Sequence, residues 1–108
     1  DLSTTNVCLT DAGGAYNKLG GQAYLRFSTT GARTITVTQT STNGGNADPD
    51  LTLLRSDGTK SVFESSIGTS ETTGAVTYGS GNHVLVVYDW KFSQGQTSGQ
   101  RCFDVTQN

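Results

Sequence analysis

Apolar and polar residues alternate with a period of two along much of the chain. The clearest run covers residues 33–39, in which Ile35 and Val37 share one side and threonines share the other. A period of two places successive side chains on opposite faces of a β-strand, so this run predicts a strand with one buried face. Residues 22–28 repeat the pattern, and residues 29–32 between the two runs have the composition of a turn. Together the three segments predict a β-hairpin.

Short turns interrupt the alternation along the rest of the chain. Leu51 and Leu53 alternate with polar residues, and the Ser-Asp-Gly turn at 56–58 then reverses the chain, which predicts a second hairpin. Residues 84–88 are apolar on both faces, as is typical of a central strand. Further strands are expected near residues 6–10, 60–64, 72–78 and 101–106, which gives about eight strands in all.

This succession of short strands without a helical segment favours an all-β fold. Two packed antiparallel sheets, in the form of a β-sandwich or jelly roll, fit the pattern best. A closed barrel is the alternative. With 108 residues and no break in composition, residues 1–108 are expected to form a single β-sandwich domain.

The two cysteines of the chain, Cys8 and Cys102, lie near its opposite ends. In a Thr-rich and Gly-rich domain with few lysines, they predict one disulfide that links the terminal strands. A disulfide requires an oxidising compartment, so a secreted, extracellular protein is expected. Two free buried thiols are the alternative.

Neutral polar residues, more than charged ones, make the chain hydrophilic. Hydrophobic residues are 32% of the sequence, charged residues are 15%, and the formal net charge is −2. The charges are scattered and form none of the basic patches that bind nucleic-acid phosphates, so no nucleic-acid partner is expected. The longest apolar run, Val84 to Val87, is far shorter than the roughly 18 residues of a membrane-spanning helix, so no membrane insertion is expected.

Five segments in the middle of the chain follow the order found in a known family. They are the two predicted hairpin strands at 23–27 and 34–37, the acidic strand at 47–53, the turn at 56–58 and the glycine-led strand at 81–88. On these segments the chain resembles the bacterial pre-peptidase C-terminal domain family, β-sandwich modules appended to many secreted proteases. The resemblance implies a non-catalytic accessory module. It also implies an extracellular ligand, because relatives in bacterial collagenases bind collagen, some of them with calcium.

Four aromatic residues are candidates for a binding surface: Tyr24, Tyr88, Trp90 and Phe92. Rigid aromatic side chains dominate binding surfaces when they are exposed. Trp90 and Phe92 follow the predicted central strand and lead into a polar loop, which favours outward presentation of one of them. The alternative is packing in the core, and it is the stronger expectation for Tyr88 and Trp90, which share a face with the valines of their strand.

Acidic residues offer a second candidate site. Asp48, Asp50, Asp57 and Asp89 carry the hard oxygen ligands that suit calcium, provided that their loops converge. The sequence has no EF-hand spacing, and Asp residues beside Gly and Pro usually form turns. Turn formation is therefore the stronger expectation, and calcium is the only cofactor considered.

No residues in the sequence predict catalysis. His83 is the only histidine, which excludes a multi-histidine zinc site, and it is expected as a half-exposed strand residue. No serine lies in a G-x-S-x-G nucleophile motif. The chain is therefore not expected to be an enzyme.

Two functions fit these observations. The first is a secreted, non-catalytic accessory module that binds an extracellular biopolymer, either a collagen-like protein or a polysaccharide, or that assists an attached secreted enzyme. The second is a structural subunit of an extracellular filament or surface assembly, whose partners are copies of itself. The Thr-rich and Gly-rich β character and the disulfide between the chain ends suggest this second function.

Overall fold

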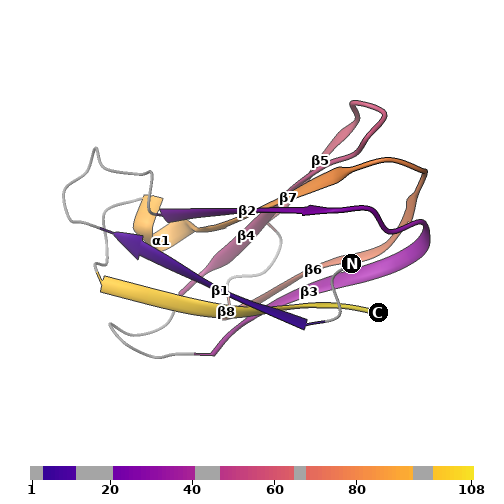
Figure 1. Cartoon of the computed structure of the whole chain (residues 1–108). Coiled ribbons are helices and arrows are strands. Elements are labelled where there is room, and N and C mark those ends of the chain that lie inside the picture. Colours follow the sequence, from indigo (N-terminus) through magenta and orange to yellow (C-terminus); the bar gives the residue numbers. More distant parts are fainter. Residues whose placement is uncertain (1–3, 12–20, 41–46, 65–67, 94–98) are drawn as a thin grey trace.

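Eight β-strands and one short helix make up the described part of the chain (Figure 1). The computed structural model describes residues 4–11, 21–40, 47–64, 68–93 and 99–108. The elements are β1 (Thr4–Asp11), β2 (Gln22–Phe27), β3 (Gly31–Gln39), β4 (Pro49–Leu54), β5 (Lys60–Phe63), β6 (Ser70–Tyr78), β7 (His83–Asp89), α1 (Trp90–Ser93) and β8 (Gly99–Gln107). Within these residues no helix is long and apolar enough to cross a membrane.

The strands form two four-stranded antiparallel sheets that pack face to face. The first sheet has the order β1-β8-β3-β6 and the second has the order β2-β7-β4-β5. Strands pair as if the chain were folded in half at the β4–β5 turn, because β4 pairs with β5, β3 with β6, β2 with β7 and β1 with β8. Rolling this long double strand on itself adds the pairs β3–β8 and β4–β7. The result is an eight-stranded jelly roll, which confirms the predicted fold class.

One of the two predicted hairpins is wrong. β2 and β3 follow each other in sequence but lie in different sheets, because β2 pairs with β7 and β3 pairs with β6 and β8. The segment between them crosses from one sheet to the other, and Gly31 begins β3 with a positive φ of 79°. The second hairpin, β4–β5, is confirmed. Its turn has Gly58 at a φ of 89°, and the Asp57 carboxylate accepts hydrogen bonds from the backbone and hydroxyl of Thr59.

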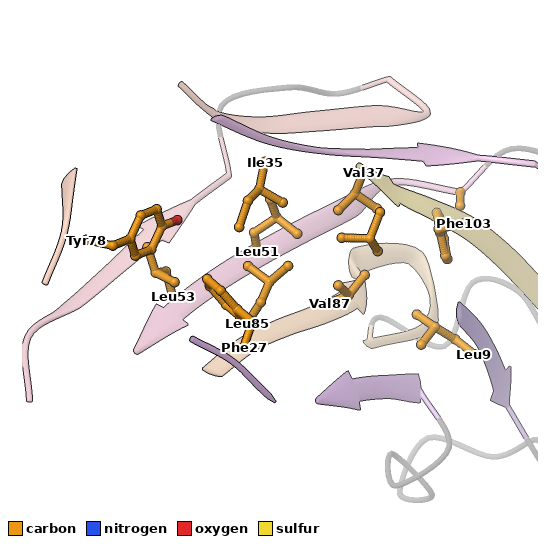
Figure 2. Packing of buried hydrophobic residues seen from close by; sticks show 12 residues of the cluster. Leu9, Phe27, Ile35, Val37, Leu51, Leu53, Tyr78, Leu85, Val87 and Phe103 are labelled. Atoms are coloured by element: carbon orange, nitrogen blue, oxygen red, sulfur yellow. The ribbon is translucent and has the colours of Figure 1, made fainter. Parts of the chain in front are cut away.

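The apolar core lies between the two sheets, and strand alternation determines which side chains enter it. Figure 2 shows side chains of β3 pointing toward side chains of β4 and β7 from the facing sheet. Full burial of one Leu, Ile or Val contributes roughly 1.5–3 kcal/mol, so this layer is the main source of stability. The fully buried aliphatic members are Leu9, Ile35, Val37, Leu51, Leu53, Leu85, Val87 and Val105.

The disulfide predicted between the terminal strands is present. Cys8 of β1 and Cys102 of β8 are directly opposite each other in the ladder, with a Cα–Cα distance of 4.0 Å. Cys8 is exposed and Cys102 is half-buried. The bond therefore crosses the outer surface of the first sheet and fixes the register of β1, while Leu9 on the same strand reaches the core.

His83 is buried, so the expectation of a half-exposed strand histidine is wrong. Its side chain is 1% exposed and contacts the rings of Phe27 and Tyr78. Nδ1 accepts a hydrogen bond from the backbone N–H of Ser56 at 3.0 Å. Nε2 lies 3.2 Å and 3.1 Å from the carbonyl oxygens of Thr29 and Gly79, and it donates to them because Nδ1 is the acceptor. The imidazole thus links three turns at one end of the sandwich.

Candidate functional site: the outer face of the second sheet

The strand register arranges the outward side chains of the second sheet in three rows. Ladder partners lie side by side, about 4.8 Å apart, and alternate residues along a strand lie on the same face. We call the resulting surface the outer face. Its middle row is Tyr24, Val86, Thr52 and Val62, one flanking row is Arg26, Val84, Leu54 and Lys60, and the other flanking row is Gln22, Tyr88, Asp50 and Glu64.

The middle of the outer face is apolar and partly open to solvent. Tyr24 is 66% exposed and Val62 is 48% exposed, and Leu54 of the adjoining basic row is 39% exposed. Val86 is only 9% exposed although it lies outside the core cluster, because it stands on the central strand between Tyr24 and Thr52. The row therefore presents exposed apolar side chains at both edges of the sheet, beside the charged rows, and exposed apolar surface rimmed by polar residues is typical of an interaction site.

The arrangement of this face explains the apolar run at residues 84–88. β7 lies between β2 and β4, which confirms the prediction of a central strand. Leu85 and Val87 point into the core, whereas Val84 and Val86 belong to the outer face. An apolar residue at every position of the strand is thus the sequence signal of an apolar outer surface as well as of a buried core.

Charged side chains stand at the two ends of the outer face. Arg26 and Lys60 belong to one flanking row, and Asp50 and Glu64 belong to the other. The two rows are four positions apart along each strand, which corresponds to about 13 Å at about 3.3 Å per residue. Sequence reasoning missed Arg26, Lys60 and Glu64, because their common face depends on which strands are neighbours.

The acidic row contains a carboxyl group that is largely buried. Asp50 is 3% exposed, and burial together with the nearby carboxylate of Asp48 raises its pKa from 3.8 to about 7. The hydroxyl of Tyr88, the cross-strand neighbour of Asp50, donates a hydrogen bond of 2.6 Å to Oε1 of Glu64. Burial and this hydrogen bond raise the pKa of Tyr88 above its usual range, so Tyr88 remains protonated and keeps the Glu64 carboxylate on the face.

Two of the four predicted binding aromatics lie on the outer face. Tyr24 is the most exposed of its large hydrophobic residues, and its hydroxyl donates a hydrogen bond to Oε1 of Gln22. Tyr88 is half-buried in the neighbouring row. Trp90 opens α1 directly after β7 and is 41% exposed, while its backbone N–H donates to the carbonyl of Asp48. The stronger expectation of core packing is therefore wrong for Tyr88 and Trp90. The side chain of Phe92 lies outside the described residues.

The four aspartates considered for calcium do not converge. Asp57 caps the exposed β4–β5 turn, whereas Asp48, Asp50 and Asp89 lie near the opposite end of β4. Asp50 belongs to the outer face, and Asp89 lies on the inner side opposite Pro49. The Asp89 carboxylate accepts hydrogen bonds from the backbone N–H groups of Asp48 and Lys91, as expected of a turn former.

Calcium binding stays a prediction. Burial and the nearby Asp89 raise the pKa of Asp48, and neither Oδ1 of Asp48 nor Oδ2 of Asp89 has a hydrogen-bond partner in the described part of the chain. No group of three or more His, Cys, Asp or Glu residues among the described ranges could hold a metal ion.

The outer surface of the first sheet has a different character. A row of threonines crosses all four of its strands, with Thr4, Thr106, Thr36 and Thr72 as successive ladder partners. The next row holds Asn6, whose amide donates to Oδ1 of Asp104, and the disulfide lies beyond it. Short polar side chains that bond to one another form a solvated surface, so the second sheet carries the better candidate site.

Fold and site together define a disulfide-linked jelly roll with an apolar, charge-flanked sheet face. A scan against protein-family models finds no family that matches the chain, and a search of curated proteins finds no match either. Membership of the pre-peptidase C-terminal domain family therefore stays a hypothesis that rests on the sequence segments quoted above.

Proposed function

We propose that this chain is a secreted, non-catalytic accessory module that binds an extracellular polymer through the outer face of the second sheet. A collagen-like protein and a polysaccharide are the two polymer classes that the sequence favours. The observation that carries the proposal is the apolar middle row with Tyr24 at its edge, 66% exposed. The resemblance to modules appended to secreted proteases supports the same role, including assistance to an attached enzyme.

The physical case for binding rests on area and shape. A sheet face is broad and open, so it fits an extended polymer better than a small molecule, which needs a concave pocket. Tyr24 adds a rigid ring with a polar hydroxyl, the combination that is enriched at binding hot spots. Covering the exposed parts of Tyr24, Val62 and Leu54 would remove apolar surface from water at about 25 cal/mol per Å².

Retention on immobilised polymers tests this proposal. The purified chain is applied to insoluble collagen, chitin and cellulose, and the bound fraction is compared with that of Tyr24→Ala and Val62→Ala. Thr77→Ala, an exposed change on β6 of the first sheet, is the matched control. We expect the chain and the control to be retained on one matrix and the two outer-face variants to be lost. Failure of all matrices to retain the chain would refute the proposal.

A structural subunit of an extracellular filament or surface assembly is the second candidate. The observation that favours it is β1, an edge strand of eight residues with no charged side chain before Asp11. Long uncharged edge strands pair readily with other chains. Light scattering of the purified chain would show polymers under this function and monomers under the first. Thr10→Pro, which removes a backbone N–H that points away from β8, would abolish polymers built through β1.

A further inference from the structure

Opposite charges stand at the two ends of the outer face, on either side of the apolar row. Arg26 and Lys60 are at one end, and the Glu64 carboxylate, beside the buried Asp50, is at the other. We propose that the ligand of this face is an extended polypeptide segment in which an acidic and a basic side chain, about four residues apart, flank apolar residues. This inference rests on the proposed function, because it names the class of polymer that the same face would bind.

The basic row is available to a partner. Arg26 and Lys60 are both exposed, and no hydrogen bond or ion pair within the described residues engages either side chain. Long basic side chains lay their methylene stems along apolar surface and keep the charged group in water. Val84 and Leu54, which lie between them in the row, offer such a surface. Each cation, one at either edge of the sheet, is therefore placed to receive a carboxylate of the ligand.

The acidic row is fixed in place. The hydrogen bond from Tyr88 holds the exposed Glu64 carboxylate beside the apolar row. Asp50 lies next to both residues and adds negative charge when its proton leaves. A carboxylate held by a neighbouring hydroxyl loses less conformational freedom when it binds a lysine or arginine, and charge-assisted hydrogen bonds are stronger than neutral ones.

The distance between the rows determines the spacing in the ligand. The basic and acidic rows are four positions apart along the strands, which is about 13 Å. An extended or polyproline II chain rises about 3.1–3.4 Å per residue, so its own charges would match both rows at a separation of about four residues. Residues between those charges would cross the middle row, in which Tyr24 and Val62 lie on the two edge strands and present exposed apolar surface.

The charge pattern favours a polypeptide over a polysaccharide. A neutral polysaccharide would leave both charged rows without a partner. A uniformly anionic polysaccharide would be attracted by the basic row and repelled by the acidic row. A polypeptide can carry one charge of each sign on a single extended segment, which gives complementary contacts at both ends.

A second copy of this chain is the competing occupant. The outer face is self-complementary, because a two-fold axis perpendicular to the strands would place the basic row of one copy over the acidic row of the other. Dimer formation through this face would be visible in light scattering and would be weakened by Lys60→Gln.

Short labelled peptides and fluorescence anisotropy test the inference. Three peptides share a proline-rich and alanine-rich sequence: one has Glu and Lys about four residues apart, one has them adjacent, and one has Gln at both positions. The protein variants are Lys60→Gln and Glu64→Gln, which remove one charge each. Glu64→Gln retains an oxygen that can accept the Tyr88 hydrogen bond. Arg33→Gln, an exposed change on the first sheet, is the charge-matched control.

We expect the peptide with spaced charges to bind about two- to fivefold more tightly than its isomer with adjacent charges at low salt, since the isomer can make only one of the two exposed ion pairs. Each outer-face variant should reduce that preference about twofold or more, and Arg33→Gln should not change it. Equal binding of the three peptides, or dimer formation through this face, would overturn the inference. Retention on chitin or cellulose that depends on Tyr24 would overturn it as well and leave the proposed function intact, whereas no retention on any polymer would refute both.

Discussion

Removal of the disulfide isolates the stability that a covalent link between the terminal strands provides. Cys8 and Cys102 are 94 residues apart in sequence. In the chain-entropy model, a closed loop of about 100 residues stabilises the folded state by about 4.7 kcal/mol at 25 °C, because the unfolded chain loses freedom. Typical domains have a total stability of about 5–15 kcal/mol. The double variant Cys8→Ser/Cys102→Ser should therefore lose about 4–5 kcal/mol and remain at least marginally folded.

The position of the bond allows this measurement to report on the unfolded chain, because the substitutions change few contacts of the folded state. Cys8 is exposed and Cys102 is half-buried, so two serines add little buried polar surface. β1 keeps its hydrogen bonds to β8 in the variant, and Leu9 keeps its place in the core. The contacts of the folded state thus change little, and the effect lies mainly in the unfolded chain.

Equilibrium unfolding in urea measures this difference, with the oxidised chain and the double variant followed by circular dichroism. The oxidised chain in the presence of a reductant is the control and should match the double variant. A loss below about 1 kcal/mol would show that loop closure does not account for the contribution of the bond, because the entropic estimate is several times larger.

Three further changes test particular contacts. His83→Phe keeps an aromatic ring in the core but removes the acceptor of the Ser56 N–H, so urea unfolding should show a free energy of unfolding that is lower by about 1–3 kcal/mol. An unchanged free energy of unfolding would contradict the role given to the imidazole. Gly81→Ala should lower the free energy of unfolding by at least about 1 kcal/mol, because Gly81 has a φ of 107° and a Cβ there would lie 2.8 Å from Cβ of Ser56. A melting temperature equal to that of the unsubstituted chain would be inconsistent with this expectation. The pKa of Asp50 is raised from 3.8 to about 7 in the folded state, so the folded chain holds the proton more tightly than the unfolded chain. Its contribution to stability is complete below the unfolded-state pKa and is lost as pH rises through 7. Asp50→Asn should therefore flatten the decline in melting temperature between pH 5 and pH 8, and identical pH profiles would refute the assignment.

The candidate site was only partly visible in the sequence. Tyr24 and Tyr88 could be selected because they are aromatic residues within predicted strands. Arg26, Lys60 and Glu64 could not, because each is an ordinary charged residue at an outward strand position. They form the two ends of one surface only when β2, β7, β4 and β5 lie side by side, in an order that does not follow the sequence.

The amino-acid pattern was sufficient to predict the strands, the inward and outward sides of those with alternating residues, the β4–β5 hairpin and the pairing of the only two cysteines. These features follow from local rules: side chains alternate along a strand, and an Asp-Gly turn reverses the chain. Three features depend on how the sheets pack: β2 and β3 belong to different sheets, His83 is buried, and Asp50 is covered although it occupies an outward strand position. They could not be predicted because the alternation of apolar and polar residues specifies which side of a strand is apolar. It does not specify which strand lies beside it. In a jelly roll those neighbours come from distant parts of the chain, as the pairing of β1 with β8 shows.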